Sequence, residues 1–282
     1  MTPFLMMLVL TAAVLHASWN ALVKKGGEPE FTIAAYQLVG GLVCLCLVPF
    51  VPLPHSDSWP AILASVLIHN IYYFSMAQAY RAGDLSQVYP LFRGLAPVLV
   101  AIGAAIFAGE ILSPGTMAGL VLISVGLMSI TLFGGKLGKI PPAALRWGLL
   151  TSVLIASYTV VDGIGVRQSG NSLSYILWLF VFEVLPIGTW LLLTRRQAWL
   201  GYMRNSAGNI IFGGIASSTA YGLVIFAMSL GAMGVVSSLR ETSVIFAALI
   251  GSLFLGEPFG RQRVIAAALV TLGIIVMRVL SG

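Results

Sequence analysis

Long apolar runs separated by short polar connectors dominate this chain of 282 residues. Ten such runs can be read, and most are close to the ~20 residues with which a helix crosses a ~30 Å hydrocarbon core. They cover residues 3–23, 31–51, 60–80, 86–108, 115–134, 145–166, 173–193, 208–230, 234–255 and 264–280. The pattern therefore predicts an all-α integral membrane protein with ten transmembrane helices.

The composition agrees with this prediction, since 59% of the residues are hydrophobic and 9% are charged, against roughly 25% charged in soluble domains. Connectors such as "KKGGEPE" and "RAGDLS" are too short to form a separate water-soluble domain. No basic residue precedes the first apolar run, whereas a secretory signal requires one. We therefore expect that run to be a membrane span, and the protein to be a multi-pass protein of a cell membrane, the bacterial inner membrane.

The net charge of +6 is spread singly or in pairs at the ends of the apolar runs. This distribution differs from the basic stripe of a nucleic-acid binder and favours a role in membrane orientation. The odd-numbered connectors carry Lys24, Lys25, Arg81, Lys136, Lys139, Arg146, Arg195, Arg196, Arg204, Arg261 and Arg263. The even connectors and termini hold little beyond Arg167 and Arg278. The bias predicts cytoplasmic odd connectors and both termini outside.

An internal repeat relates the two halves of the chain. The aligned pairs, each 147 positions apart, are Arg93 with Arg240, Gly109 and Glu110 with Gly256 and Glu257, and Gly126 with Gly273. A weaker match joins "ASWNALVKKG" from Ala17 with "ASYTVVDGIG" from Ala156. Because each half holds five spans, an odd number, the second half enters the membrane from the opposite side. We predict two inverted five-helix repeats, 1–138 and 139–282, around a central cavity near the midplane.

These features resemble the EamA-type transporters of the drug/metabolite transporter superfamily. The resemblance rests on the two five-helix halves, on the repeated "GE" turns, on the glycine in each last helix and on the "ASWN" aromatic of the first run. It covers essentially the whole chain. It implies a secondary transporter, and many members of this family export amino acids and other small metabolites.

Aromatic and polar side chains share helix faces in several runs, which is how a cavity inside a bundle would be lined. The candidate substrate-binding residues are Trp19, Asn20, His69, Tyr72, Tyr73, Tyr80, Tyr89, Arg93, Tyr158, Tyr221 and Arg240. The alternative for each stripe is plain packing between helices.

Arg93 lies well inside an apolar run, and its planar guanidinium can hold a carboxylate bidentately. The functional interpretation is that it binds the anionic end of the substrate near Tyr89. The structural interpretation is an ion pair with Glu241 or Glu183 across the bundle. Glu241 follows Arg240 directly, and neighbours on a helix point apart, so these two need not pair.

The sequence also allows predictions for the remaining ionisable residues, the glycines and the cysteines. His69, Glu183 and Glu241 are the groups able to exchange protons if transport is proton-coupled; facilitated diffusion is the alternative. Asp162 is expected to pair with Arg167 or to extend to the interface. The "GE" motifs predict helix stops, and Gly115 and Gly119 predict close helix packing. Cys44 and Cys46 are expected to face different sides as buried packing residues.

Motifs of phosphate-binding loops, paired metal ligands and "GxSxG" nucleophiles are missing from the sequence. We therefore expect no enzyme activity, no cofactor and no metal, and as partners a small molecule and the lipid bilayer. The leading hypothesis is an amino-acid exporter that works by alternating access. The alternatives are a lipid-carrier flippase of the same fold and, third, a membrane enzyme acting on a lipid carrier through His69 and Asp162.

Overall fold

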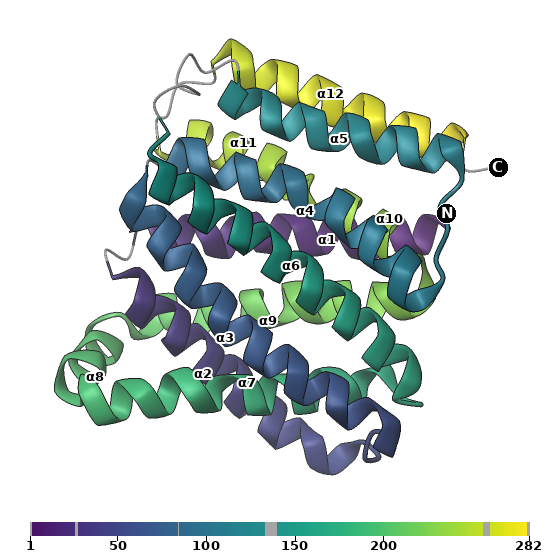
Figure 1. The fold of residues 1–282 in the computed structure, drawn as a ribbon. Coiled ribbons are helices and arrows are strands. Elements are labelled where there is room, and N and C mark those ends of the chain that lie inside the picture. Colours follow the sequence, from purple (N-terminus) through teal and green to yellow (C-terminus); the bar gives the residue numbers. More distant parts are fainter. Residues whose placement is uncertain (1, 26–27, 84, 133–139, 256–259, 281–282) are drawn as a thin grey trace.

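The protein is described by a computed structural model that covers residues 2–25, 28–83, 85–132, 140–255 and 260–280. Within these ranges the chain forms twelve α-helices, two short 3-10 turns and no β-strand (Figure 1). The all-α membrane architecture predicted from the sequence is confirmed at this level.

The helices follow one another with short connections. Their bounds are α1 Pro3–Lys25, α2 Pro29–Leu47, α3 Trp59–Ala82, α4 Leu85–Ala108, α5 Pro114–Leu132, α6 Pro142–Gln168, α7 Ser172–Thr194, α8 Arg196–Asn205, α9 Ala207–Leu230, α10 Met233–Arg240, α11 Ser243–Leu255 and α12 Arg261–Val279. The short helix α8 lies in a stretch that the hydrophobic pattern left as a connector. Figure 1 shows α8 at the end of the bundle opposite to the two termini.

Seven helices among the described residues are long and apolar enough to cross a membrane, namely α1, α2, α3, α4, α6, α7 and α9. The predicted runs 115–134 and 264–280 are represented by shorter apolar helices, Pro114–Ile130 and Val264–Val279. The prediction of one helix over 234–255 was wrong. That run is divided into α10 and α11, because Thr242 N bonds to Leu239 O, three residues back, as Glu241 N does to Ser238 O.

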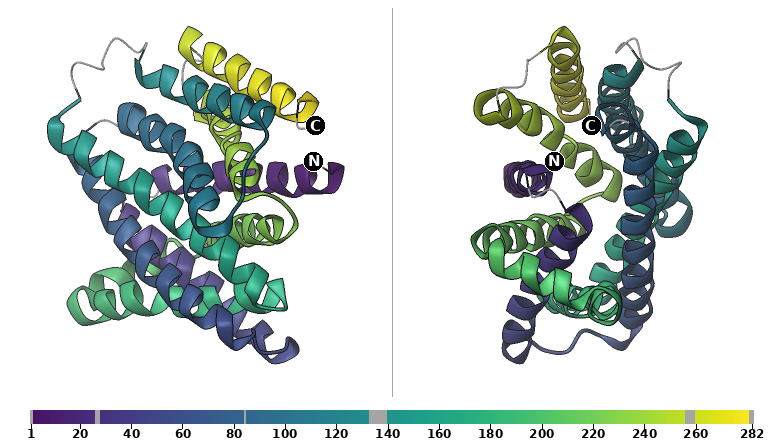
Figure 2. Two further views of the ribbon diagram at one scale, coloured as in Figure 1. Left: turned by 45° about the vertical axis from the view of Figure 1, so that its right-hand side comes forward. Right: turned by 90° about the vertical axis from the view of Figure 1, so that its left-hand side faces the viewer.

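Helices from distant parts of the chain lie side by side. α3 packs on α6, α1 on α9 and α2 on α7, while α5 packs along α12 (Figures 1 and 2). α4 contacts both α6 and α10. Most of these contacts join an element of the first half of the chain to one of the second, so any space at the centre of the bundle is bounded by both halves.

Glycines allow α5 and α12 to approach closely. A Cβ at Gly119 would lie 2.5 Å from Gly273 O, and one at Gly273 would lie 2.7 Å from Gly119 O. A Cβ at Gly115 would lie 2.3 Å from atoms of Leu280. The close packing predicted for Gly115 and Gly119 is confirmed, and only a residue without a side chain fits there.

The first "GE" motif ends α4 and joins four helices. Gly109 has φ +66°, which is the left-handed conformation of a helix stop. The Glu110 carboxylate lies 2.5 Å from Arg167 Nη1 and accepts a hydrogen bond from Met233 N, at the start of α10, at 2.8 Å. Arg167 also donates to the carbonyls of Met228 and Gly231 where α9 ends. The structural role predicted for this motif is confirmed; Gly256 and Glu257 lie outside the described residues.

Candidate functional site

A cavity of about 70 Å³ lies between α1, α2, α3, α6, α7, α9 and α10. Its aromatic lining consists of His16, Trp19, Tyr36, His69, Tyr72, Tyr73, Tyr158, Phe180 and Tyr221. Its other polar lining residues are Gln37, Glu183, Ser217, Ser218 and Arg240. The cavity is therefore amphipathic and is formed by helices of both halves.

The sequence-based candidates divide into two groups by position. The residues that line the cavity are Trp19, His69, Tyr72, Tyr73, Tyr158, Tyr221 and Arg240, together with Glu183 from the proton-exchange candidates. The residues that do not line it are Asn20, Tyr80, Tyr89, Arg93 and Glu241. Asn20 donates to His16 O within α1, and both Tyr80 and Tyr89 contact the ring of Phe92.

The lining residues that were not selected from the sequence include Tyr36, Gln37 and Phe180. Gln37 offered a usable signal, since it is the single amide in the apolar run 31–51. Tyr36 and Phe180 carried none, because an aromatic side chain in an apolar run is equally typical of packing.

Stacked rings hold the imidazole of His69 in place. The His69 ring lies 4.0 Å from the Tyr158 ring with an interplanar angle of 24°, and 5.3 Å from the Tyr221 ring. Its Nδ1 lies 3.0 Å from Ser65 O and 3.1 Å from Ser65 Oγ, one turn earlier on α3. The ring thus bridges α3, α6 and α9 at the cavity wall.

Arg93, Arg240 and Glu241 form a buried group that we call the arginine cluster. Arg93 Nε lies 2.7 Å from Glu241 Oε2, and Arg240 Nε lies 3.6 Å from Glu241 Oε1. All three side chains are at most 3% exposed. The sequence left open whether Arg240 and Glu241 pair. They lie within ion-pair distance because α10 ends at Arg240 and Glu241 is no longer its neighbour on a regular helix. Two cations thus share one carboxylate.

Two other buried acids form no ion pair among the described residues. Glu183 Oε1 accepts hydrogen bonds from Tyr73 Oη at 3.0 Å and from Gln37 Nε2 at 3.3 Å. Asp162 accepts from Tyr175 Oη at 2.9 Å and from Tyr221 Oη at 2.5 Å. The expected pairing of Asp162 with Arg167 was wrong, since Arg167 contacts Glu110 at the end of the bundle. We call Asp162 and Glu183 the unpaired acids.

Several polar atoms of the lining lack any hydrogen-bond partner in the described part of the chain. They include Trp19 Nε1, Gln37 Oε1 and Arg240 Nη2, whereas Arg240 Nε, also without a hydrogen bond, lies 3.6 Å from Glu241 Oε1. Buried polar groups are almost always hydrogen-bonded. Two donors and one acceptor left open around one cavity are groups that a bound molecule can satisfy. No three His, Cys, Asp or Glu side chains of the described ranges gather as a metal site would require.

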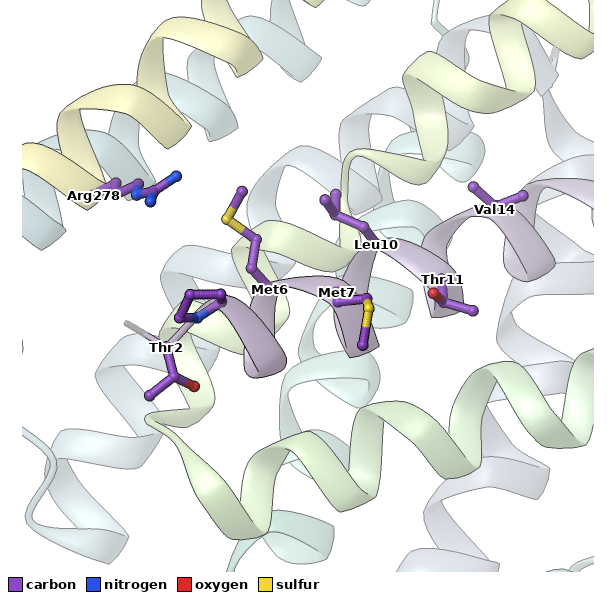
Figure 3. A pocket seen from close by; sticks show the side chains of 8 residues that line it. Thr2, Met6, Met7, Leu10, Thr11, Val14 and Arg278 are labelled. Atoms are coloured by element: carbon purple, nitrogen blue, oxygen red, sulfur yellow. The ribbon is translucent and has the colours of Figure 1, made fainter.

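A second pocket, of about 400 Å³, lies between the start of α1 and Arg278 near the end of α12 (Figure 3). Met6, Met7, Leu10 and Val14 give it a mainly apolar lining. It shares no lining residue with the central cavity. Its position and lining separate it from the amphipathic site.

In the described part of the chain, helices long and apolar enough to cross a membrane surround a central amphipathic cavity, which indicates a multi-pass membrane protein with an internal site for a small molecule. The EamA-like transporter family model matches the chain twice, over residues 3–132 and 143–279. The chain therefore belongs to the EamA-like transporter family, and the resemblance noted from the sequence is confirmed.

A solved structure titled "Crystal structure of protein" is similar in fold. It aligns with a TM-score of 0.77, with 18% sequence identity, over 100% of this chain and 98% of that chain. At this identity the likeness concerns the fold alone. None of the curated proteins compared with the chain matches it.

Proposed function

We propose that the protein is a secondary transporter that moves a small amphipathic metabolite, an amino acid, outward through the central cavity by alternating access. The observation that carries the proposal is the set of open polar atoms around that cavity, Trp19 Nε1, Gln37 Oε1 and Arg240 Nη2. They offer donors to a carboxylate and an acceptor to an ammonium group, between aromatic walls suited to an apolar side chain.

Arg240 is the group best placed to hold the carboxylate. It is 3% exposed, lines the cavity and shares Glu241 with Arg93, so the arginine cluster carries one positive charge in excess. Glu183 lines the same cavity without a cation partner in the described chain. A zwitterion would compensate both charges at once, which favours an amino acid over a molecule of a single charge.

The two halves support alternating access. The family model matches each half separately. In the proposed repeat, α1, α2 and α3 correspond to α6, α7 and α9. Exchanging the two halves therefore turns the α3–α6 contact into the α9–α1 contact, and it leaves the α2–α7 contact unchanged, as two related repeats require. We propose the ten spans as two inverted repeats, 1–138 and 139–282, with α10 and α11 together forming the ninth span. The odd connectors are cytoplasmic and both termini lie outside, in the bacterial inner membrane.

The size of the cavity indicates a contracted site. About 70 Å³ is far below the ~300 Å³ at which ligand pockets begin. Substrate entry therefore needs the helices of the two halves to separate at one end. Of the three proton-exchange candidates, His69 and Glu183 line the cavity, whereas Glu241 does not and has its charge compensated by two arginines.

The lipid-carrier flippase is less well supported. Such a protein needs a lateral apolar groove that joins the transport path, and the apolar pocket beside α1 shares no lining residue with the cavity. The enzyme hypothesis is also less well supported, because both carboxylate oxygens of its candidate acid, Asp162, accept hydrogen bonds from tyrosine hydroxyls.

Flux measurements in proteoliposomes made from the purified protein test the proposal. Radiolabelled amino acids should cross faster than in empty vesicles. Arg240→Lys should weaken substrate binding by about 1 to 3 kcal/mol, as expected for a lost charged hydrogen bond. Arg81→Lys is the matched control, because Arg81 is exposed and pairs with Glu30 away from the cavity. Flux of fluorescent lipid with no amino-acid flux would overturn the proposal in favour of a flippase.

A further inference from the structure

Asp162 is a buried acid that the proposed transport path does not use directly. It lies on α6 and is 0% exposed, and within the described chain it has no cation at ion-pair distance. Its two oxygens accept one hydroxyl each, from Tyr175 on α7 and Tyr221 on α9. An ionised carboxylate with neutral donors alone is costly at this depth, and such groups in membrane proteins mark ion or proton pathways.

Tyr221 connects this acid to the cavity. Its hydroxyl contacts Asp162, and its ring belongs to the cavity lining and lies 5.3 Å from the ring of His69. Tyr175, by contrast, is not part of the lining. Tyr221 is therefore the tyrosine partner of Asp162 that also forms part of the cavity wall.

The remaining neighbours of Asp162 leave its charge uncompensated. The groups that face it are His69 and Ser65 from α3, Tyr175 from α7 and Tyr221 from α9. α4, α10 and the 3-10 turn Ser56–Ser58, also packed on α6, place no ionisable side chain against it in the described ranges. On α6 itself, Tyr158 stacks on His69 and Arg167 contacts Glu110. His69 is thus the one neighbour able to carry a positive charge.

We propose that Asp162 is a proton-binding site of the transport cycle, reached from the cavity through Tyr221. The inference rests on the proposed transport function. In each cycle the carboxylate takes a proton from water on one side, becomes neutral while the cavity is contracted, and releases the proton to water on the other side. The Tyr175 hydroxyl and water stabilise the ionised form once Tyr221 has moved aside and water has access, and burial favours the neutral form once the cavity closes.

Infrared difference spectroscopy across a pH step tests the site without any substrate. The reconstituted protein should show a carboxylic-acid carbonyl band that Asp162→Asn removes. Tyr175→Phe keeps the carboxyl and removes one donor, so the band should remain at a shifted frequency. If Asp162→Asn does not fold, a band shifted by Tyr175→Phe still assigns the proton to Asp162. A full set of bands in folded Asp162→Asn, or no shift in Tyr175→Phe, overturns the proposal.

Transport measurements separate coupling from a purely structural role. With the amino acid that wild type transports best, Asp162→Asn should lose the response to an imposed pH gradient and keep substrate exchange at equal pH. A structural role would reduce both activities alike, and that result would contradict coupling at Asp162. Absence of amino-acid flux in wild type would refute the proposed function instead, and the infrared result would stand independently.

Discussion

The arginine cluster and the unpaired acids differ in what surrounds their buried carboxylates: cations in the first case and neutral hydrogen-bond donors in the second. In the arginine cluster, Glu241 lies between two guanidinium groups, 2.7 Å from Arg93 and 3.6 Å from Arg240. The unpaired acids, Asp162 and Glu183, accept hydrogen bonds from neutral tyrosine and glutamine side chains. A charge that is compensated inside a membrane stays fixed, whereas an acid without a cation can become neutral by taking up a proton. The first group suits structure and anion binding, and the second suits proton exchange.

The largest expected effect is that of Glu241→Gln. The change leaves two arginines in the interior without their carboxylate, and breaking a buried pair in this way costs about 3 to 5 kcal/mol. Thermal unfolding of the purified protein in detergent measures it. Glu30→Gln is the control, because Glu30 pairs with an exposed arginine at the end of the bundle and should cost about 0 to 1 kcal/mol. Equal stability of the two variants would show that the cluster is not needed for folding.

Arg93→Lys sharpens the same comparison. A lysine keeps the charge and loses the planar fork that contacts Glu241 and Ser243, so we expect a loss of stability of about 1 to 3 kcal/mol. Substrate affinity should stay unchanged, since Arg93 does not line the cavity. Unfolding and substrate binding are measured on the same preparation. Normal stability with weakened binding would restore Arg93 as the group that holds the substrate carboxylate.

Glu110→Gln is expected to have a smaller effect, about 1 kcal/mol. Glu110 has one cation partner, Arg167, and both side chains are partly exposed, 14% and 32%. A glutamine keeps an acceptor for Met233 N and loses only the charge. Unfolding at low and high salt measures it, because salt screens an exposed pair more than a buried one. A loss as large as that of Glu241→Gln would mean that the contact at this end also acts as a buried pair.

The all-helical membrane architecture and the first "GE" turn could be predicted from the sequence because both depend on local physics. A run of ~20 apolar residues must be helical in lipid, and Gly109 takes the positive φ that ends a helix. The division of 234–255 at Glu241 could not be predicted from local sequence, since the residues at the turn contact a distant helix. Arg93 lies 2.7 Å from Glu241 and donates to Ser243, which is 150 residues later in the chain. Contacts with a distant helix therefore accompany the break between α10 and α11.

The same reason separates the candidate site residues. Stripes on a single helix correctly indicated which faces are polar, and Tyr72, Tyr73 and His69 do share a wall of one cavity. Helical spacing does not show how far along the bundle axis a residue lies. Tyr80 and Tyr89, which do not line the cavity, could therefore not be distinguished from the lining residues Tyr72 and Tyr73. Asp162 was assigned to Arg167 by proximity in sequence, but its partners are tyrosines on α7 and α9.

The smallest expected effect on stability is that of Glu183→Gln. Glu183 has no cation partner in the described chain, so no buried positive charge is left behind, and the glutamine oxygen still accepts from Tyr73. Replacing a buried acid by its amide should then change the free energy of unfolding by less than about 1 kcal/mol. The effect on function should be large, because an amide cannot exchange a proton or hold an ammonium group. Unfolding and amino-acid flux, measured side by side with Glu241→Gln, test this directly. A destabilisation as large as that of Glu241→Gln would show that Glu183 meets a cation in the folded protein, and the contrast between compensated and unpaired acids would then no longer hold.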